Sequence, residues 1–167
     1  MKKRNIILIG MPGAGKSSVG VILAKVLGYE FIDTDLVIQH REKRLLREII
    51  ADEGNEGFLA IENEVNATLE ADKSVIAPGG SAIYGKEAME HFKEIGTIVY
   101  LKLSHEDLAK RLGNLKGRGV VLKEGQTLKD LYDERSKLYE QYAEITVDES
   151  GRDIQGTILA LREQIGM

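Results

Sequence analysis

A glycine-rich segment close to the start of the chain has the residue types and spacing of a phosphate-binding loop. Residues 10–17 read GMPGAGKS and fit the pattern G-x-x-x-x-G-K-[ST]. Glycines let the backbone curl tightly enough to point several N–H groups at one anion. Lys16 would reach the β- and γ-phosphates of a nucleotide, and the Ser17 hydroxyl would bind Mg²⁺. We favour a nucleotide site over a chance glycine-rich turn, and its predicted residues are Gly13, Ala14, Gly15, Lys16, Ser17 and Ser18.

Two aspartates, Asp33 and Asp35, follow an apolar pair that is expected to form a strand. A magnesium nucleotide needs a carboxylate close to its metal, and phosphoryl transfer to an alcohol is helped by a second carboxylate that orients the hydroxyl and accepts its proton. Asp33 and Asp35 can divide these roles if the chain bends between them. The alternative is that Asp35 only caps the helix expected to begin near Leu36. Behind a phosphate-binding loop, the pair becomes the leading candidate for the reactive site.

Short apolar runs alternate with amphipathic stretches along the whole chain. The runs are typical of strands buried on both faces, and the stretches between them have the apolar spacing of helices. Strands separated by helices indicate an α/β fold with a mostly parallel sheet and helices on both faces. Such sheets bind ligands at the carboxyl ends of their strands, where both motifs fall. The predicted strands are residues 6–9, 31–32, 74–77, 97–101 and 145–147, and the predicted helices are residues 16–27, 35–51, 56–71, 86–93, 104–112, 127–143 and 154–165.

The composition indicates one domain that needs no metal or disulfide scaffold. A chain of 167 residues, 43% of them apolar, can bury about 70% of its extended surface. The net charge of −4 argues against a general nucleic-acid binder, and the absence of cysteine excludes disulfides and thiolate catalysis. The three histidines lack metal-ligand spacing, and no apolar run approaches the roughly 20 residues that cross a bilayer. We expect a single cytoplasmic domain over residues 1–167 that binds neither nucleic acid nor membrane.

Taken together, the motifs resemble those of the shikimate kinase family, small relatives of the nucleoside monophosphate kinases. The resemblance covers nearly the whole chain through the segments GMPGAGKSS, FIDTD, GNEGFLAIE, IAPGG, RLGNLKGRG and LYDERSKLYEQYA. It implies a three-layer α/β/α P-loop fold with a five-stranded parallel sheet, a substrate-binding segment at about residues 34–71 and a lid at about residues 112–125. It also implies a monomer that uses ATP and Mg²⁺ to convert shikimate to shikimate 3-phosphate in aromatic amino acid biosynthesis.

The resemblance assigns roles to the residues of the reactive site. Lys16 and Ser17 match the family's phosphate and magnesium residues, and Asp33 matches its magnesium-side aspartate. Asp35 matches the aspartate that binds the substrate hydroxyls and serves as base. Arg118 matches the lid arginine that neutralises the transferring phosphoryl group, a role that suits a planar guanidinium. The expected catalytic residues are therefore Lys16, Asp35 and Arg118.

Four further positions match binding residues of the family. Arg111 falls where an arginine stacks on adenine, and Arg135 falls where an arginine grips the substrate carboxylate. Gly79 and Gly80 match the glycine-rich end of the third strand, whose backbone faces the substrate. From the residues alone, Arg111 could be a solvated charge, and Arg135 could pair with Asp130 along its own helix. The spacing of these residues does not separate ATP from GTP.

Three positions depart from the family pattern, at Leu59, Ser81 and Gly119. Leu59 replaces the arginine of a phenylalanine–arginine pair, Ser81 the last glycine of a triplet, and Gly119 the proline of an arginine–proline pair. The lost arginine is a second carboxylate-binding residue in the family. Losing such a charge-assisted contact costs about 1.5–3 kcal/mol, or roughly ten- to over a hundredfold in binding.

Two residues could adapt the acceptor site to the loss of that arginine. Arg47, on the preceding helix, could supply the missing charge to a shikimate carboxylate. Glu62, which matches the partner of the lost arginine, could instead face a substrate ammonium while Arg135 keeps a carboxylate. The acceptor would then be a hydroxy amino acid or another small hydroxylated compound, such as a gluconate-like acid. Both possibilities stay open at this level.

A different class of function is a nucleotide-binding module without acceptor chemistry. Leu59, Ser81 and Gly119 could be signs of decay. The catalytic set of Asp33, Asp35, Arg118 and Arg135 is intact, which favours an enzyme. Nucleic-acid translocation or repair would require a basic surface that this composition does not provide. We therefore predict an ATP-dependent kinase that acts on a small hydroxylated acid.

Overall fold

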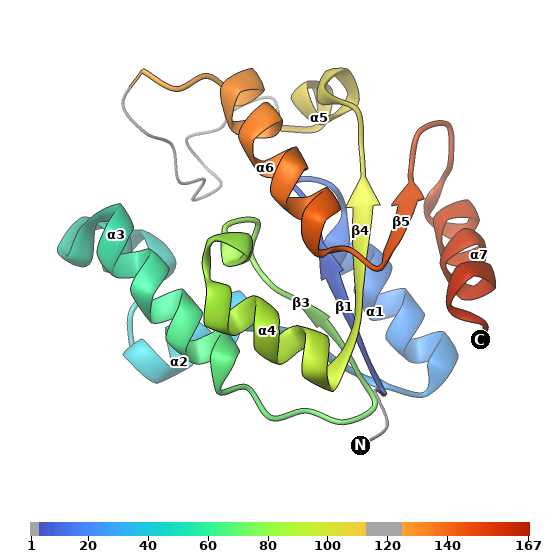
Figure 1. The fold of residues 1–167 in the computed structure, drawn as a ribbon, viewed down its shortest axis with the longest axis horizontal. Helices are drawn as coiled ribbons and strands as arrows, with labels where there is room; N and C mark the ends of the chain where they lie inside the picture. The colour runs from blue at the N-terminus through green and yellow to red at the C-terminus, as the bar shows by residue number, and fades with distance from the viewer. Residues whose placement is uncertain (1–3, 113–124) are drawn as a thin grey trace.

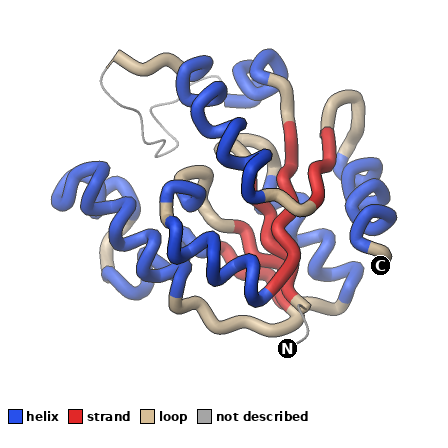
Figure 2. The backbone as a smooth tube through the Cα atoms, in the orientation of Figure 1, coloured by secondary structure: helices blue, strands red, loops and turns tan. Residues whose placement is uncertain are grey.

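The computed structural model describes residues 4–112 and 125–167 of the chain. Five parallel strands form one sheet in the order β2-β3-β1-β4-β5, with helices on both faces (Figures 1 and 2). This confirms the predicted three-layer α/β/α architecture. The strands are β1 (Asn5–Ile9), β2 (Glu30–Asp33), β3 (Ser74–Ala77), β4 (Gly96–Lys102) and β5 (Ile145–Asp148). The helices are α1 (Lys16–Leu27), α2 (Thr34–Glu42), α3 (Leu46–Ala67), α4 (Lys86–Ile95), α5 (His105–Leu112), α6 (Leu128–Tyr142) and α7 (Ile154–Ile165), with a short 3₁₀ helix η1 (Ala82–Tyr84).

Alternate residues of the central strand β1 contribute to the hydrophobic clusters on the two faces of the sheet. Ile7 and Ile9 pack with residues of α4, α5 and α6, whereas Ile6 and Leu8 pack with residues of α1 and α7. A strand that is buried on both faces needs an unbroken apolar run, which the sequence IILI provides. Figure 1 shows α1 and α7 on one side of the sheet and α4 and α6 on the other. The helices therefore cover both faces of the sheet.

Parallel pairing brings the carboxyl ends of neighbouring strands to one edge of the sheet. Ile9, the last residue of β1, pairs with Tyr100 of β4, and Asp33, the last residue of β2, pairs with Ala77, the last residue of β3. The strand β3 lies between β1 and β2. The turn after β3 is therefore flanked by the phosphate loop after β1 and by the aspartates after β2, as the position of ligand sites in such sheets leads one to expect.

The predicted helix over residues 35–51 is wrong, because the structure divides this stretch into α2 and α3. Lys43 ends α2 in the left-handed conformation, with a φ of 55°. The Leu46 backbone N–H, at the start of α3, donates a hydrogen bond to the side-chain oxygen of Gln39. Arg44 adds ion pairs to acidic residues on both sides of the turn. The turn contains neither glycine nor proline, and the apolar spacing continues across it. The sequence therefore gave no sign of a break between the two helices.

The predicted break at Gly54 is present as a kink inside α3, where Gly54 adopts a φ of 74°. The helix predicted over residues 56–71 is the second part of α3 and ends at Ala67. Both α1 and α7 have their predicted bounds. Most of the predicted lid, residues 113–124, lies outside the described residues. Within the described part of the chain, none of the helices is both long and apolar enough to span a membrane.

Candidate active site

A cavity of about 430 Å³ opens at the carboxyl edge of the sheet. Its walls come from the loop after β1, the start of α2, both parts of α3 and the turn after β3. Arg111, near the end of α5, and Arg135, in α6, also line it. Of the predicted site residues that the structure describes, all except Ala14 and Arg47 line this cavity. One cavity thus collects motifs from the beginning, middle and end of the chain.

The loop between β1 and α1 has the shape of an anion-binding loop. Gly13 and Gly15 adopt positive φ angles of 89° and 82°, a conformation in which a side chain would be strained. Gly15 is the N-cap of α1, so the free N–H groups of the first helical turn lie at the cavity. Lys16 Nζ donates to the carbonyl oxygens of Gly10 and Met11, both at 2.9 Å. Burial lowers the pKa of the Lys16 ammonium to about 8, and the group is still predominantly charged at neutral pH.

Asp33 and Asp35 play different parts at the start of α2. Asp33, rather than Asp35, caps the helix, because its Oδ1 accepts a hydrogen bond from the Asp35 backbone N–H at 2.9 Å. The alternative that Asp35 is only a helix cap is therefore wrong, and Asp35 lines the cavity. Burial and the charge of Asp33 raise the pKa of Asp35 to about 6, while Lys16 acts to lower it. Such a carboxylate is ionised at neutral pH and can still accept a proton, as a general base must.

The turn after β3 presents bare backbone to the cavity. A methyl carbon added to Gly79 would lie 2.9 Å from Asp35 Oδ1, and one added to Gly80 would lie 2.9 Å from Arg135 Nη1. The Tyr139 hydroxyl donates to the Gly80 carbonyl oxygen at 2.7 Å and so holds the turn in place. The carboxylate of Asp35 and the guanidinium of Arg135 therefore lie over neighbouring glycines, where any larger side chain would meet them.

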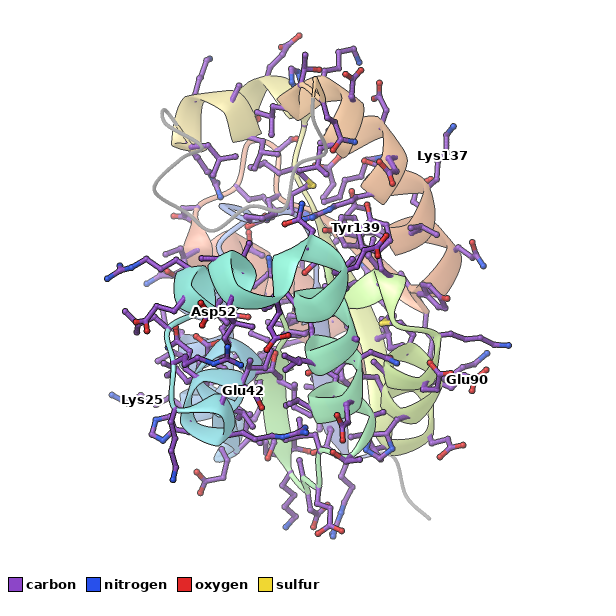
Figure 3. The ribbon with its side chains drawn as sticks, turned by 90° about the vertical axis from the view of Figure 1, so that its left-hand side faces the viewer. Lys25, Glu42, Asp52, Glu90, Lys137 and Tyr139 are labelled. Atoms are coloured by element: carbon purple, nitrogen blue, oxygen red, sulfur yellow. The ribbon has the colours of Figure 1, made fainter. Side chains whose placement is uncertain are left out.

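Arg135 is a buried cation on the inner side of α6. Only 1% of its surface is exposed, and its guanidinium carbon lies 5.6 Å from the ring centre of Tyr84. Tyr139 on the same helix also points inward, whereas Lys137 points to solvent (Figure 3). Asp130, the ion-pair partner considered from the sequence, is exposed and takes part in the capping box at the start of α6. A buried guanidinium in a cavity wall suits the grip on a carboxylate that the sequence predicts for Arg135.

Arg111 lies beside the phosphate loop. Its Nη1 donates to the Gly13 carbonyl oxygen at 3.3 Å, and its side chain is exposed. An exposed guanidinium can stack on the flat face of a base, and the contact with adenine stays a prediction. Ser17 and Ser18 are exposed in the first turn of α1, at the cavity. Arg118, the predicted lid arginine, lies outside the described residues.

The departures at Leu59 and Ser81 change the charge on the acceptor side of the cavity. Leu59 packs against the apolar cluster between α2 and α3. Ser81 Oγ donates to Glu62 Oε1 at 2.6 Å, and both residues are buried. Burial raises the pKa of Glu62 to about 7, although the hydrogen bond from Ser81 acts to lower it. Arg47 is exposed in the first turn of α3, outside the cavity wall, and its role in holding a carboxylate stays a prediction.

Glu149 is a charged residue near the site that the sequence analysis did not select. It follows β5 directly and is only 5% exposed. A methyl carbon added to Gly15 would lie 3.8 Å from Glu149 Oε1. Burial raises the pKa of Glu149 to about 7, while the charges of Arg111 and Lys16 act to lower it. An acidic residue immediately after the last strand of a parallel sheet is the signal that could have identified it.

Ser17 and Asp33 provide two oxygen ligands at the phosphate end of the cavity. Asp33 uses Oδ1 for the helix cap, and the Ser17 side chain is exposed. Mg²⁺ prefers oxygen ligands, keeps several water molecules and commonly binds through one or two protein oxygens together with substrate phosphates. This pair of side chains therefore fits a magnesium ion that shares its ligands with a nucleotide.

The family described as shikimate kinase matches residues 12–165 of this sequence. The chain belongs to the shikimate kinase family. The curated shikimate kinase 2 of Yersinia enterocolitica is 34% identical over 154 residues, which cover 87% of this chain and 86% of that protein. The shikimate kinase 2 of Yersinia pseudotuberculosis is 33% identical over the same shares of the two chains.

Solved shikimate kinases also share the fold of this chain. The enzyme from Acinetobacter baumannii, solved in complex with shikimate, has a TM-score of 0.86 and 32% identity, covering 97% of this chain and 92% of that one. The enzyme from Aquifex aeolicus has a TM-score of 0.82 and 28% identity, covering 97% of this chain and 96% of that one. The present shikimate kinase family member is therefore an ATP-dependent small-molecule kinase with a P-loop fold.

Proposed function

We propose that this kinase transfers the γ-phosphoryl group of ATP to a hydroxyl of a small hydroxylated carboxylic acid. Shikimate, which would give shikimate 3-phosphate, is the acceptor that family membership favours. The observation that carries the proposal is the presence of Lys16, Asp35 and Arg135 in the wall of one cavity. These side chains supply a phosphate-binding cation, a base and a carboxylate-binding guanidinium. Within one kinase domain, residues 34–71 would hold the acceptor and residues 112–125 would form the lid.

The loop after β1 would bind the phosphates of the nucleotide. Its glycines and the first turn of α1 offer backbone N–H groups and the positive end of the helix dipole. The Lys16 ammonium lies across this loop on the carbonyl oxygens of Gly10 and Met11. Rotation of its flexible side chain would bring it to the phosphates, where it stabilises the charge that develops during transfer. Arg111, which contacts the Gly13 carbonyl oxygen, would stack on the base of the nucleotide.

Asp35 would orient the acceptor hydroxyl and accept its proton while the hydroxyl oxygen forms a bond to the γ-phosphorus. The bond between that phosphorus and the bridging oxygen breaks, and ADP leaves with the electron pair. Arg135 would bind the acceptor carboxylate, and the bare backbone of Gly79 and Gly80 would let the acceptor lie close to both residues. Positioning and electrostatic stabilisation provide the rate enhancement in such transfers.

Ser17 and Asp33 would hold Mg²⁺, which neutralises charge on the phosphate oxygens when it is bound. Arg118 would add a further positive charge at the transferring group, as predicted from the sequence. Closure of residues 112–125 over the cavity would exclude the water that otherwise hydrolyses ATP. Each of these roles for the chain's own residues can be tested by substitution.

The proposal is tested by ADP release in a coupled assay with shikimate as the first acceptor. We expect acceptor-dependent ADP release by the parent, and a loss of at least about 100-fold in kcat for Lys16→Ala and for Asp35→Asn. Lys25→Ala, at an exposed position in the last turn of α1 that does not line the cavity, is the matched control and should keep the parent rate (Figure 3). A near-normal rate in either site variant, with the fold intact by circular dichroism, contradicts the role assigned to it.

The predicted role of Arg47 has its own test. If this exposed arginine moves in to grip the acceptor carboxylate, Arg47→Ala should raise the KM for shikimate about tenfold or more while the KM for ATP stays the same. An unchanged KM for shikimate removes this role and leaves Arg135 as the residue that binds the carboxylate.

The nucleotide-binding module without acceptor chemistry, considered because of Leu59 and Ser81, is not retained, because the chain belongs to a family of ATP-dependent small-molecule kinases.

A further inference from the structure

Glu62 presents a buried carboxylate oxygen that the proposed phosphoryl transfer does not use. The side chain projects from the second part of α3 into the cavity wall, and 1% of the residue is exposed. Its Oε1 accepts the hydrogen bond from Ser81 Oγ at 2.6 Å. Its Oε2 has no hydrogen-bond partner among the described residues. A buried carboxylate oxygen left in this way is costly, and its position in a cavity wall indicates a ligand as the missing partner.

The unpartnered oxygen lies beside the proposed base. A methyl carbon added to Gly79 would lie 3.1 Å from Glu62 Oε2 and 2.9 Å from Asp35 Oδ1. Both carboxylate oxygens therefore lie close beside the Gly79 backbone and near each other. Two ionised carboxylates in such proximity repel each other, and a ligand that carries positive charge and several N–H donors relieves that repulsion.

None of the cations that the structure describes in the cavity wall donates a hydrogen bond to Glu62 Oε2. Lys16 donates to the carbonyl oxygens of its own loop, and Arg111 donates to the carbonyl oxygen of Gly13. Arg135 lies over Gly80 and near the ring of Tyr84, and its charge acts with the Ser81 hydrogen bond to lower the pKa of Glu62. Leu59 lies about one turn before Glu62 on α3, and its apolar side chain packs in a hydrophobic cluster.

Acidic and basic side chains thus lie beside two neighbouring glycines. Glu62 and Asp35 approach Gly79, and Arg135 approaches Gly80. An α-amino acid carries its ammonium and its carboxylate on the same carbon and so offers both charges over a short span. With the ammonium at Glu62 and the carboxylate at Arg135, a hydroxyl on the side chain of the amino acid would be available to Asp35.

We propose that Glu62, held by Ser81, forms a subsite for a protonated amine, so that this kinase phosphorylates hydroxy amino acids with a lower KM than the matching hydroxy acids that lack the amine. The inference rests on the proposed function and names the class of acceptor that the same site prefers. Burial alone would keep Glu62 partly protonated near neutral pH, since it raises the pKa to about 7. A bound ammonium stabilises the ionised form of Glu62. The charge-assisted hydrogen bond then offsets the cost of burying that charge and makes the contact specific for an amine.

Matched pairs of acceptors isolate the amine. L-serine is compared with 3-hydroxypropionate, L-threonine with 3-hydroxybutyrate, and L-homoserine with 4-hydroxybutyrate, so that each pair differs only in the amino group. In at least one pair, we expect kcat/KM from ADP release to be about tenfold or more higher for the amino acid than for the hydroxy acid. This increase should come from a lower KM for the amino acid. Calorimetry with a non-hydrolysable ATP analogue present gives the corresponding ratio of Kd values without requiring turnover.

Substitution of Glu62 tests whether this residue carries the preference. Glu62→Gln keeps the size of the side chain and an oxygen that can accept from Ser81, but it removes the charge. We expect it to raise the KM and Kd of the amino acid about tenfold or more and to bring the two members of the pair close together. Glu64→Gln, an exposed position on the same helix, should leave the ratio unchanged.

The outcomes separate this inference from the proposed function. If the hydroxy acids and shikimate are phosphorylated but no pair shows a preference for the amine, the function stands and the amine subsite is wrong. Failure of every amino acid to bind in calorimetry also overturns the subsite, as does an unchanged ratio in Glu62→Gln. If ATP binds and no acceptor of any kind is phosphorylated, the proposed function fails, and the ratio of Kd values alone then decides the inference.

Discussion

Asp35 and Glu62 are two carboxylic acids whose pKa values are raised by burial at the same edge of the sheet. The charge of Lys16 acts to lower the pKa of Asp35. A hydrogen bond from Ser81 acts to lower the pKa of Glu62. The difference suits different tasks, because Asp35 must lose and regain a proton near neutral pH while Glu62 must present a charge to a ligand. Residues with shifted pKa values gather at functional sites for reasons of this kind.

We expect kcat/KM for the acceptor to fall as the pH drops below about 6. The pKa of Asp35 is raised to about 6, so the carboxyl is protonated below that pH and cannot accept the proton of the hydroxyl. Above it the carboxylate is ionised, and kcat/KM should level off. Initial rates from about pH 5 to pH 8 at constant ionic strength check this. A profile that stays flat down to pH 5 argues against Asp35 as the base.

Glu62→Gln should stabilise the free protein at alkaline pH. The pKa of Glu62 in the folded state, about 7, lies above the ordinary value of 4.5, so the folded state favours the protonated form. The carboxylate therefore costs stability progressively as the pH rises from about 4.5 to 7, by on the order of 3 kcal/mol in full. Thermal unfolding at pH 8 should show a Tm several degrees higher for the variant than for the parent, and the two should converge near pH 4.5.

Glu64→Gln is the control for that comparison, because Glu64 is exposed on the same helix. It should follow the parent at both pH values. If Glu62→Gln is less stable than the parent at pH 8, the ionised Glu62 carboxylate does not destabilise the folded protein. That result would contradict the cost expected from its burial and its one unpartnered oxygen.

At the scale of elements, the turn after β3 depends on one hydrogen bond from α6. The Tyr139 hydroxyl is buried and donates to the Gly80 carbonyl oxygen at 2.7 Å. The same helix supplies Arg135, so this bond fixes the distance between the glycines and the guanidinium above them. Removing the bond would leave a buried carbonyl without its partner and would loosen the acceptor side of the cavity.

We expect Tyr139→Phe to lower the free energy of unfolding by about 1–2 kcal/mol and to raise the KM of the acceptor more than that of ATP. Tyr142→Phe is the matched control at the end of the same helix, where the ring packs at the edge of the core. Urea unfolding and steady-state kinetics give the two quantities. Equal changes in both KM values would mean that the hydroxyl supports the domain generally rather than the acceptor side.

The elements with strong local signals were predictable, and those set by tertiary contacts were not. Both α1 and α7 have the predicted bounds, since a glycine or aspartate marks their starts and a glycine follows each end. The division between α2 and α3 was missed, because the left-handed turn at Lys43 is held by Gln39 and Arg44 rather than by glycine or proline. Periodicity cannot register such contacts.

At the scale of the whole molecule, the sheet order explains why motifs far apart in the sequence form one site. The order β2-β3-β1 sets the turn after β3 between the phosphate loop and the aspartates, and these positions followed from the rule for parallel sheets. The contact between Ser81 and Glu62 could not be foreseen, because it joins a turn to a helix through packing. Glu149 was missed because its one signal, an acidic residue directly after the last strand, is weaker than a motif of several residues.

The most direct test of the account is phosphorus NMR of the products formed from ATP and Mg²⁺ with shikimate and with the hydroxy amino acid pairs. The account predicts a phosphate monoester on the acceptor hydroxyl in the same amount as ADP, and loss of that signal in Asp35→Asn. Orthophosphate as the only new signal, or no consumption of ATP with any acceptor, would contradict the assignment of this cavity to phosphoryl transfer.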